Sequence, residues 1–285
     1  RGGHFRFSWH HIDLEEISAA DTVIFAAGYS HVTEGEGYDR SFELPAGQPE
    51  LLRLVSEKNP RTAVVVNAGG AFDTSGWLDQ CPALLHAWYG GQDEGQAVAD
   101  ILFGNVNPSG KLPISFEKRW EDSAAYGNYP GENGHMSYEE GIFVGYRHFD
   151  QNDIEPLFPF GYGLSYTSFE YSNLTQSADR MGADGSVTFY VDVTNTGNWS
   201  GAEIVQLYTE QPDCSVPRPP KELRRFSRVE LCPGETRTVE MTLTPEDLEF
   251  FHPEQNGWTT ESGTVTVDIG ASSRDIRGRT TFTLS

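Results

Sequence analysis

The sequence TVIFAAGYSHVTEGEGYDR, residues 22–40, joins an apolar run to a loop rich in glycine and acidic residues. The apolar run is nearly continuous and ends at Gly28, which predicts a strand buried on both faces of a sheet. The loop that follows holds Glu34 and Glu36 beside glycines, and a helical pattern begins just after it. In open α/β sheets the crevice where a strand gives way to such a loop is where ligands bind. We therefore expect the chemistry here.

Two further apolar runs, at residues 63–67 and 84–88, are also predicted strands. Helices are expected at 13–17, 47–58 and 74–80, and after Gly95, where apolar residues follow helical spacing. This alternation of strand and helix predicts a parallel α/β layer. Three strands make a thin sheet. We therefore expect the layer to be partial and to expose apolar surface at its edge and faces.

The pattern changes after a long connection, residues 104–165, which is rich in glycine, proline and tyrosine. Aromatic residues at this density are expected to pack the connection onto a domain. Val187, Phe189, Val191 and Val193 then alternate with polar residues, and similar runs recur up to residue 269. About seven short strands in this region predict a β-sandwich. The fold class is thus α/β with a mainly parallel sheet over residues 1–165, followed by an all-β sandwich over residues 166–285.

The composition of the chain argues against several classes of binding partner and site. The 285 residues carry a net charge of −22, from 42 acidic against 20 basic residues, which repels nucleic acid and anionic membranes and suits a neutral substrate. No apolar run is long enough to span a membrane. Cys81, Cys214 and Cys232 show no zinc-ligand spacing, so we expect no zinc site. We also expect no other metal site and no cofactor. Cys81 is expected to be buried, and pairing of Cys214 with Cys232 is left open.

Seven stretches follow in order along the chain: GEGYDR at 35–40, VVVNAG at 64–69, GQDEG at 91–95, ADILFGNVNPSGKLP at 99–113, VGYR at 144–147, FPFGYGLSYTSF at 158–169 and ASSRDIR at 271–277. Together they resemble glycoside hydrolase family 3, the β-glucosidase and β-xylosidase group. The resemblance covers nearly the whole chain and is to the C-terminal half of such enzymes.

The resemblance implies three parts in a whole enzyme: a TIM-like barrel, an α/β sandwich and a fibronectin-III-like β-sandwich. The family's nucleophile is an aspartate followed by tryptophan in the barrel, and neither that dipeptide nor the family's sugar-binding Lys-His pair occurs here. The resemblance also implies that the opening half of the α/β sandwich is absent from this sequence. The chain therefore resembles one piece of a split, nicked or truncated enzyme, whose partner is a barrel-bearing polypeptide.

Glu36 is similar in position to the family's general acid/base, four residues before Arg40. Retaining glycosidases use two carboxyl groups, one as nucleophile and one as acid and then base. The acid must hold a proton near neutral pH, which burial or a neighbouring negative charge achieves by raising its pKa. Glu34 is the second candidate, though more readily explained as a solvated neighbour. For Asp39 and Arg40 we expect an ion pair or turn bond that fixes the loop, rather than contact with sugar.

Other polar and aromatic residues receive structural assignments. Asp93 and Glu94 are expected to complement a helix dipole rather than bind a metal ion. Arg147 is expected to brace the active-site loop. Core packing is preferred to a sugar platform for three aromatic residues, Trp77, Trp88 and Tyr89. The C-terminal sandwich is expected to brace the enzyme rather than bind substrate.

The resemblance predicts the acid/base-supplying portion of a retaining, exo-acting β-glucosidase that removes terminal non-reducing β-D-glucosyl residues. The alternatives left open are a β-xylosidase of the same family and a non-catalytic carbohydrate-binding or structural module. Expected partners are a β-glucoside or oligosaccharide and the barrel-bearing polypeptide, with no nucleic acid and no membrane; a homodimer is left open. A secreted or periplasmic location is expected, with a cytoplasmic one also left open.

Overall fold

The computed structural model describes residues 12–285, which divide by their contacts into two compact units. The first unit holds residues up to Asp100 together with Glu117–Glu121, and the second holds Ile101–Phe116 and Asp122–Ser285. Judged by its contacts, most of the long connection at residues 104–165 therefore belongs to the same unit as the β-sandwich. The domain division after residue 165 stays a prediction.

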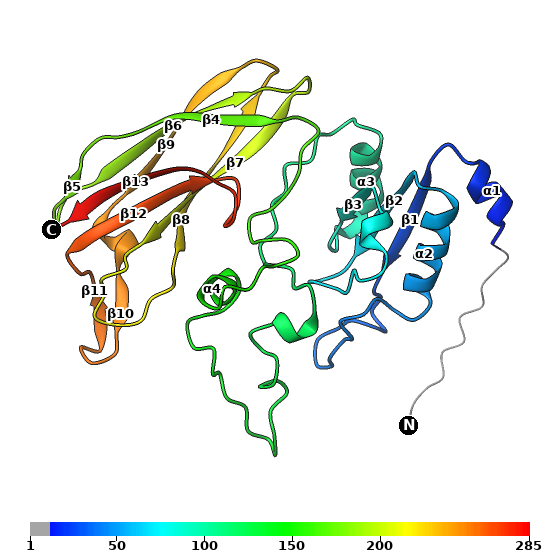
Figure 1. Ribbon diagram of the computed structural model, residues 1–285, viewed down its shortest axis with the longest axis horizontal. Coiled ribbons are helices and arrows are strands. Elements are labelled where there is room, and N and C mark those ends of the chain that lie inside the picture. The colour runs from blue at the N-terminus through cyan, green and yellow to red at the C-terminus, as the bar shows by residue number, and fades with distance from the viewer. Residues whose placement is uncertain (1–11) are drawn as a thin grey trace. The chain divides into compact units, whose positions relative to one another are not determined.

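The first unit is a parallel sheet with helices between its strands (Figure 1). Its strands are hydrogen-bonded in chain order, as β1 (Val23–Gly28), β2 (Thr62–Asn67) and β3 (Ala83–His86). Its helices are α1 (Leu14–Ala19), α2 (Gln48–Lys58) and α3 (Glu94–Leu102), the last of which runs two residues into the second unit. The parallel α/β layer predicted from the strand–helix alternation is confirmed.

Two sequence-based boundaries in this unit are wrong. The strand expected at 84–88 ends at His86, because Trp88 has a positive φ of 56° that a strand does not allow. The helix expected at 74–80 is a turn followed by the short 3-10 helix η1 (Leu78–Gln80). Cys81, expected to be buried, is only partly so.

The second unit is a two-sheet sandwich, as the period-two pattern predicted (Figure 1). One sheet has the strand order β5-β13-β12-β7-β8 and the other β4-β6-β9. The strands are β4 (Phe169–Gln176), β5 (Arg180–Met181), β6 (Val187–Asn195), β7 (Gly201–Glu210), β8 (Glu222–Leu231), β9 (Thr236–Leu243), β12 (Gly263–Gly270) and β13 (Ile276–Leu284). A separate hairpin pairs β10 (Phe250–His252) with β11 (Gly257–Thr259).

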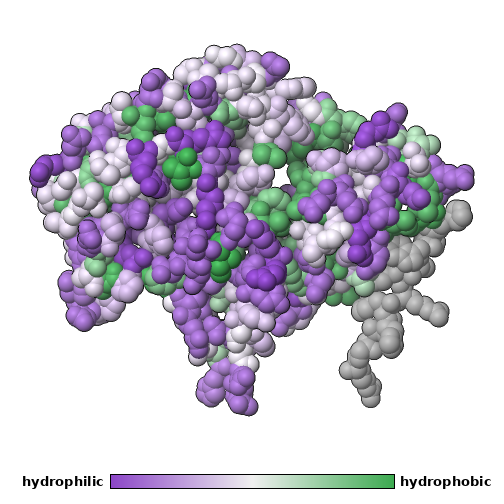
Figure 2. Space-filling model, in the orientation of Figure 1, coloured by the Kyte–Doolittle hydropathy of each residue, from purple (hydrophilic) through white to green (hydrophobic). Residues whose placement is uncertain are grey.

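The sandwich core follows from the alternation along each strand. In β6 the residues Val187, Phe189, Val191 and Val193 are buried, while the residues between them are partly exposed. Eighteen buried apolar residues form one continuous cluster between the sheets. On the face shown in Figure 2 the sandwich surface is mainly hydrophilic with scattered apolar residues, as its high charge leads one to expect.

The aromatic connection packs on the second unit through α4 (Tyr146–Gln151). The Tyr146 ring stacks on Phe160 at 4.8 Å between ring centroids and meets Tyr208 edge-on at 6.0 Å. The packing role predicted for the connection is thus confirmed. Within residues 12–285 no helix is both long and apolar enough to cross a bilayer, and all three cysteines are free thiols, including Cys214 and Cys232.

Candidate active site

Glu36 occupies the tip of a tight turn. Gly35 and Tyr38 form an antiparallel bridge on either side of it, and Gly37 has a φ of 82°, which is the positive value that the third residue of a type II turn requires. The Tyr38 hydroxyl donates a hydrogen bond to the carbonyl oxygen of His31 at 2.7 Å and so closes the turn. The carboxyl of Glu36 is exposed and has no hydrogen-bond or ion-pair partner among residues 12–285.

Glu34, two residues earlier, is held from three sides. Its carboxylate accepts two hydrogen bonds from the backbone N–H of Gly69 at 3.2 Å each and one from the Tyr89 hydroxyl at 2.6 Å. The Arg40 Nε lies 3.2 Å from the Glu34 Oε1, and the Glu34 side chain is only 19% exposed. Glu34 is thus an anchored ion, not the solvated neighbour that was expected. We call Glu34, Arg40, Gly69 and Tyr89 the Glu34 cradle.

The absence of a side chain at Gly69 is a requirement of this cradle. A Cβ at that position would lie 2.5 Å from the Glu34 Oε1, closer than any normal contact. The backbone N–H can approach the carboxylate only because the residue is glycine. A carboxylate bonded by a backbone N–H, a phenol and a guanidinium is among the strongest arrangements of this kind.

Arg40 joins the loop to the neighbouring strand connection. Besides its ion pair with Glu34, its Nη2 donates to the carbonyl of Ala71 at 2.6 Å, and its guanidinium lies 4.5 Å from the centre of the Tyr29 ring. The expectation that Arg40 fixes the loop by an ion pair is confirmed. Asp39 is exposed beside it.

Two tyrosines beside Arg40 stay protonated at neutral pH. Burial raises the pKa of the Tyr29 phenol to about 12, against a smaller opposing effect of the Arg40 charge. Burial and then the hydrogen bond to Glu34 raise the pKa of Tyr89 to about 12. Tyr89 is therefore a hydrogen-bond donor to Glu34 over the physiological pH range.

The base of the loop is closed by one side chain. Gln48, the first residue of α2, accepts a hydrogen bond from the backbone N–H of Gly28 at 2.9 Å and donates one to the Gly28 carbonyl at 2.9 Å. The last residue of β1 is therefore tied to the first residue of α2. The loop between them, residues 29–47, is fixed at its base and again at the Glu34 cradle.

In the second acidic loop, Glu94 has the place in the first turn of a helix that was predicted for it. Glu94, in the first turn of α3, accepts a hydrogen bond from the Asn67 amide and another from the backbone N–H of Gly90 at 3.2 Å. Asn67 also donates to the carbonyl of Trp88 at 2.9 Å, which holds the positive-φ residue in place. Within residues 12–285 no group of three His, Cys, Asp or Glu side chains is arranged to hold a metal ion.

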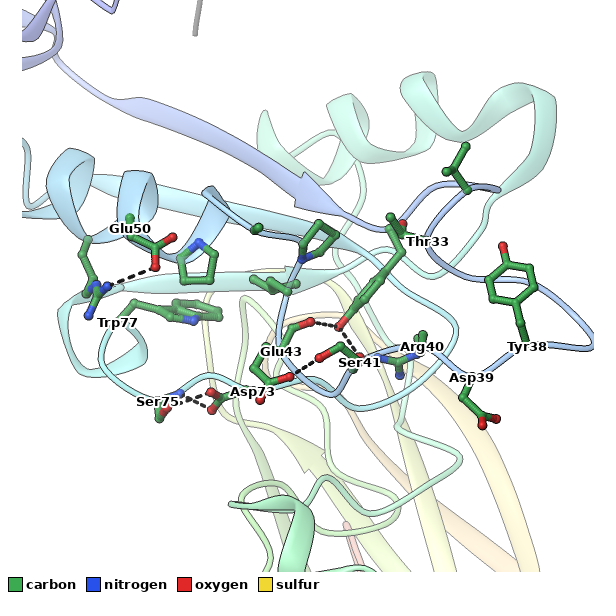
Figure 3. A pocket seen from close by; sticks show the side chains of 17 residues that line it. Thr33, Tyr38, Asp39, Arg40, Ser41, Glu43, Glu50, Asp73, Ser75 and Trp77 are labelled. Atoms are coloured by element: carbon green, nitrogen blue, oxygen red, sulfur yellow. Dashed lines mark hydrogen bonds and ion pairs between the residues drawn. The ribbon is translucent and has the colours of Figure 1, made fainter. Parts of the chain in front are cut away.

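A cavity of about 650 Å³ lies beside the loop (Figure 3). Tyr38 and Asp39 lie at one end in that view, and Trp77 and Glu50 lie at the other. Glu36 is not among the residues that line it. The acidic tip and this cavity are therefore separate features of the loop.

The core packing predicted for Trp77, Trp88 and Tyr89 holds for some of these residues and not for others. Trp77 is 1% exposed and packs in the core, as expected. Trp88 is partly buried, with its ring edge-on to His86 at 4.1 Å. Tyr89 is 53% exposed and bonded to Glu34, so core packing is wrong for this residue. Arg147 is an ion-pair partner of Glu222 on β8 at 3.6 Å.

Sequence reasoning missed Gly69 and Tyr89, although a signal for both was present. Glu34, Gly69 and Tyr89 each follow the carboxyl end of a predicted strand, and the strands are parallel neighbours in the order β1-β2-β3. The carboxyl ends of parallel strands meet at one edge of the sheet, so residues just beyond them converge. Treating the three strand ends as one site would have identified the cradle.

Comparison with known proteins gives a consistent result for both units. Residues 10–146 match the glycosyl hydrolase family 3 C-terminal domain, and residues 203–273 match the fibronectin type III-like domain. The proposed domain division after residue 165 falls between these two matches.

Curated relatives and solved structures agree with this result. A β-glucosidase from Bacteroides ovatus is 44% identical over 94% of this chain and 37% of its own length, and thermostable β-glucosidase B from Acetivibrio thermocellus is 42% identical over 91% and 34%. The crystal structure of a β-glucosidase from Bifidobacterium adolescentis superposes with a TM-score of 0.91 at 35% identity, covering 98% of this chain and 42% of that one. A Kluyveromyces marxianus β-glucosidase in complex with glucose gives 0.89 at 39% identity, covering 95% and 32%.

This chain thus spans about a third of the length of the curated relatives it matches. Along this chain, the match to the family's C-terminal domain precedes the match to the fibronectin type III-like domain. The chain belongs to glycoside hydrolase family 3, of which it carries a C-terminal portion.

Proposed function

We propose that this chain supplies the acid/base to a retaining, exo-acting β-glucosidase that removes terminal non-reducing β-D-glucosyl residues. The observation that carries the proposal is the pair of glutamates in the loop after β1: Glu34 is bound by its cradle, whereas Glu36 is presented on the turn with an unpartnered carboxyl. A carboxyl that is rigidly placed yet free of internal partners is available to a substrate. Glucosides are proposed over xylosides because the relatives reported above are named β-glucosidases.

In the first half of the reaction Glu36 would donate its proton to the glycosidic oxygen, and the aglycone would leave as an alcohol. The electron pair of an aspartate on the barrel would form the bond to the anomeric carbon as the bond to that oxygen breaks. In the second half the Glu36 carboxylate would take a proton from water, whose oxygen attacks the same carbon as the bond from that carbon to the aspartate breaks, which releases glucose and the free aspartate. Glu36 ends protonated, as it began.

Glu36 is exposed in the part of the chain that the structure describes. Burial or a nearby negative charge is what raises the pKa of a catalytic acid. In this proposal both come from the barrel, whose nucleophilic aspartate would lie about 5–5.5 Å from the acid. The barrel is supplied by another chain or by a segment outside the sequence given.

The test is a chimera in which this chain replaces the matching C-terminal portion of the Bacteroides ovatus relative. Aryl β-glucoside hydrolysis by the chimera is expected to fall about 10²–10⁴-fold in Glu36→Gln for a poor leaving group, the size of effect for loss of a general acid. Added azide is expected to restore turnover of an activated aryl glucoside and to yield β-glucosyl azide, since azide needs no base to attack the glycosyl-enzyme.

The matched control is Glu132→Gln, because Glu132 is also an exposed glutamate in a glycine-flanked turn. It is expected to leave turnover unchanged. Full activity in Glu36→Gln, or loss of equal size in Glu132→Gln, would remove Glu36 from the acid/base role. Native mass spectrometry of the 31.6 kDa chain mixed with the barrel portion of the relative shows directly whether the two associate.

A further inference from the structure

The β10–β11 hairpin displays two aromatic rings on its outer face. Phe251 and Trp258 are direct cross-strand partners, their ring centroids lie 6.1 Å apart in an edge-to-face arrangement, and they are 47% and 69% exposed. Figure 1 shows the hairpin extending beyond the main strands of its sandwich. Other exposed aromatic residues of the sandwich, Trp199 and Phe226, have no ring partner among residues 12–285. Single exposed aromatic rings are common on protein surfaces, whereas two exposed rings in contact with each other are less so.

The hairpin is held firmly from its inner face. His252 is 7% exposed, and its two ring nitrogens lie 3.3 Å from the Ser215 hydroxyl and 3.3 Å from the backbone N–H of Gln255. The guanidinium of Arg218 covers the Phe250 ring at 4.8 Å. The outer rings are therefore presented on a fixed support, so little conformational entropy is lost when something binds them.

The apolar area is too small for a protein partner. A stable protein–protein interface buries roughly 1,200–2,000 Å² in total, whereas one aromatic side chain buries only about 150–250 Å² even when it is covered completely. Phe251 and Trp258 are already partly covered. The pair matches a small or linear ligand instead.

The charge of the segment that carries the rings disfavours polyanions, although Arg218 lies over Phe250 on its inner side. Residues 244–261 contain five carboxylates and no lysine or arginine: Glu246, Asp247, Glu249, Glu254 and Glu261. Nucleic acid, anionic glycans and anionic membranes would be repelled by this segment. Neutral hydrogen-bonding groups are close at hand, since Gln255 and Asn256 are exposed in the turn that joins the two strands.

We propose that Phe251 and Trp258 form a binding platform for a neutral polysaccharide of the β-linked glucan class. The C–H groups on the flat faces of a β-linked pyranose carry a small positive charge, which the negative face of an aromatic ring attracts. The hydroxyl groups around the sugar's edge remain free for Gln255 and Asn256. The sandwich thereby holds polymer near the enzyme, in addition to the bracing role expected of it.

The choice of a β-linked glucan rests on the proposed function, whereas the aromatic pair is a feature of the second unit and its binding is measured without Glu36 or turnover. It is tested with the full 285-residue chain by native gel electrophoresis, with mixed-linkage β-glucan or hydroxyethylcellulose embedded in the gel. The polymer is expected to retard the wild-type chain. Trp258→Ala is expected to weaken the apparent affinity about tenfold, the effect of losing one well-covered aromatic contact, and Phe251→Ala less. The control Trp199→Ala removes another exposed indole, 55% exposed against 69% for Trp258, and is expected to migrate like the wild type.

Each other outcome overturns the proposal. Equal mobility of the wild-type chain with and without polymer excludes a glucan platform. Equal loss in Trp199→Ala shows that retardation is not specific to the hairpin. A concentration-dependent dimer in sedimentation velocity that Trp258→Ala abolishes assigns the same surface to self-association instead. Circular dichroism of each variant confirms that the surface substitutions leave the fold intact.

Discussion

The two units of this chain bury their apolar residues to different degrees. The second unit encloses eighteen apolar side chains between two sheets. In the first unit the apolar stripe of α3 leaves no residue fully buried, and Ile24 on β1 is 50% exposed. The exposed apolar surface predicted for the thin sheet is thus confirmed. Exposed apolar faces of this kind mark surfaces where further protein packs, which agrees with relatives about three times as long as this chain.

The two units also differ in how their polar and charged side chains are paired. In the first unit the cradle directs backbone and side-chain donors onto Glu34, and Glu36 has no partner among residues 12–285. In the second unit, charged side chains pair among themselves: Glu222 alone has Arg218 at 2.6 Å, Arg224 at 2.7 Å and Arg147 at 3.6 Å. Charged side chains thus pair with one another in the sandwich, whereas in the α/β unit several donors gather on the single acid Glu34.

The largest expected effect is in the sandwich core. Phe189, which is fully buried, sits inside the apolar cluster, so Phe189→Ala is expected to lower the free energy of unfolding of the second unit by about 3–5 kcal/mol. The half-exposed Ile24→Ala in the first unit is expected to cost less than about 1 kcal/mol. Urea unfolding followed by hydrogen-exchange mass spectrometry reports the two units separately. Equal losses of unfolding free energy in Phe189→Ala and Ile24→Ala would show that the two units do not differ in how strongly apolar packing stabilises them.

The next effect concerns the Glu34 cradle. Tyr89→Phe removes the donor at 2.6 Å from Glu34 and is expected to cost about 1–3 kcal/mol of local stability, since the bond is to a charged acceptor. Amide hydrogens of residues 30–40 are expected to exchange faster, with the second unit unaffected. Tyr138→Phe is the matched control, because Tyr138 is 72% exposed. Unchanged exchange in Tyr89→Phe would show that the remaining cradle suffices to hold the loop.

Sequence patterns predicted the parts of this chain that depend on local order. Period-two alternation around Phe189 identified the sandwich, and the run ending at Gly28 identified the strand that precedes the site. The cradle depends instead on contacts between residues 35 and 55 positions apart, Glu34 with Gly69 and with Tyr89. No local pattern encodes such pairs. The early end of β3 was missed for a similar reason, because Asn67 holds Trp88 in a conformation that its own sequence disfavours.

The smallest effect expected is a pH dependence confined to the first unit. His86 lies between the rings of Phe72, at 5.6 Å, and Trp88, at 4.1 Å, and burial lowers the pKa of its imidazole below the usual 6.5. The unfolded chain then binds a proton more readily than the folded one. The stability that neutral His86 allows is therefore present above about pH 6.5 and is lost as the pH falls below it.

Urea unfolding of the first unit, followed by far-ultraviolet circular dichroism of its helices, is expected to shift to lower urea between about pH 7.5 and 5.5. The variant His86→Phe keeps an aromatic ring between Phe72 and Trp88 but cannot take up a proton, so its shift is expected to be smaller. A wild-type shift that survives unchanged in His86→Phe would assign the pH dependence to other groups. The contrast between the two units would then rest on packing alone.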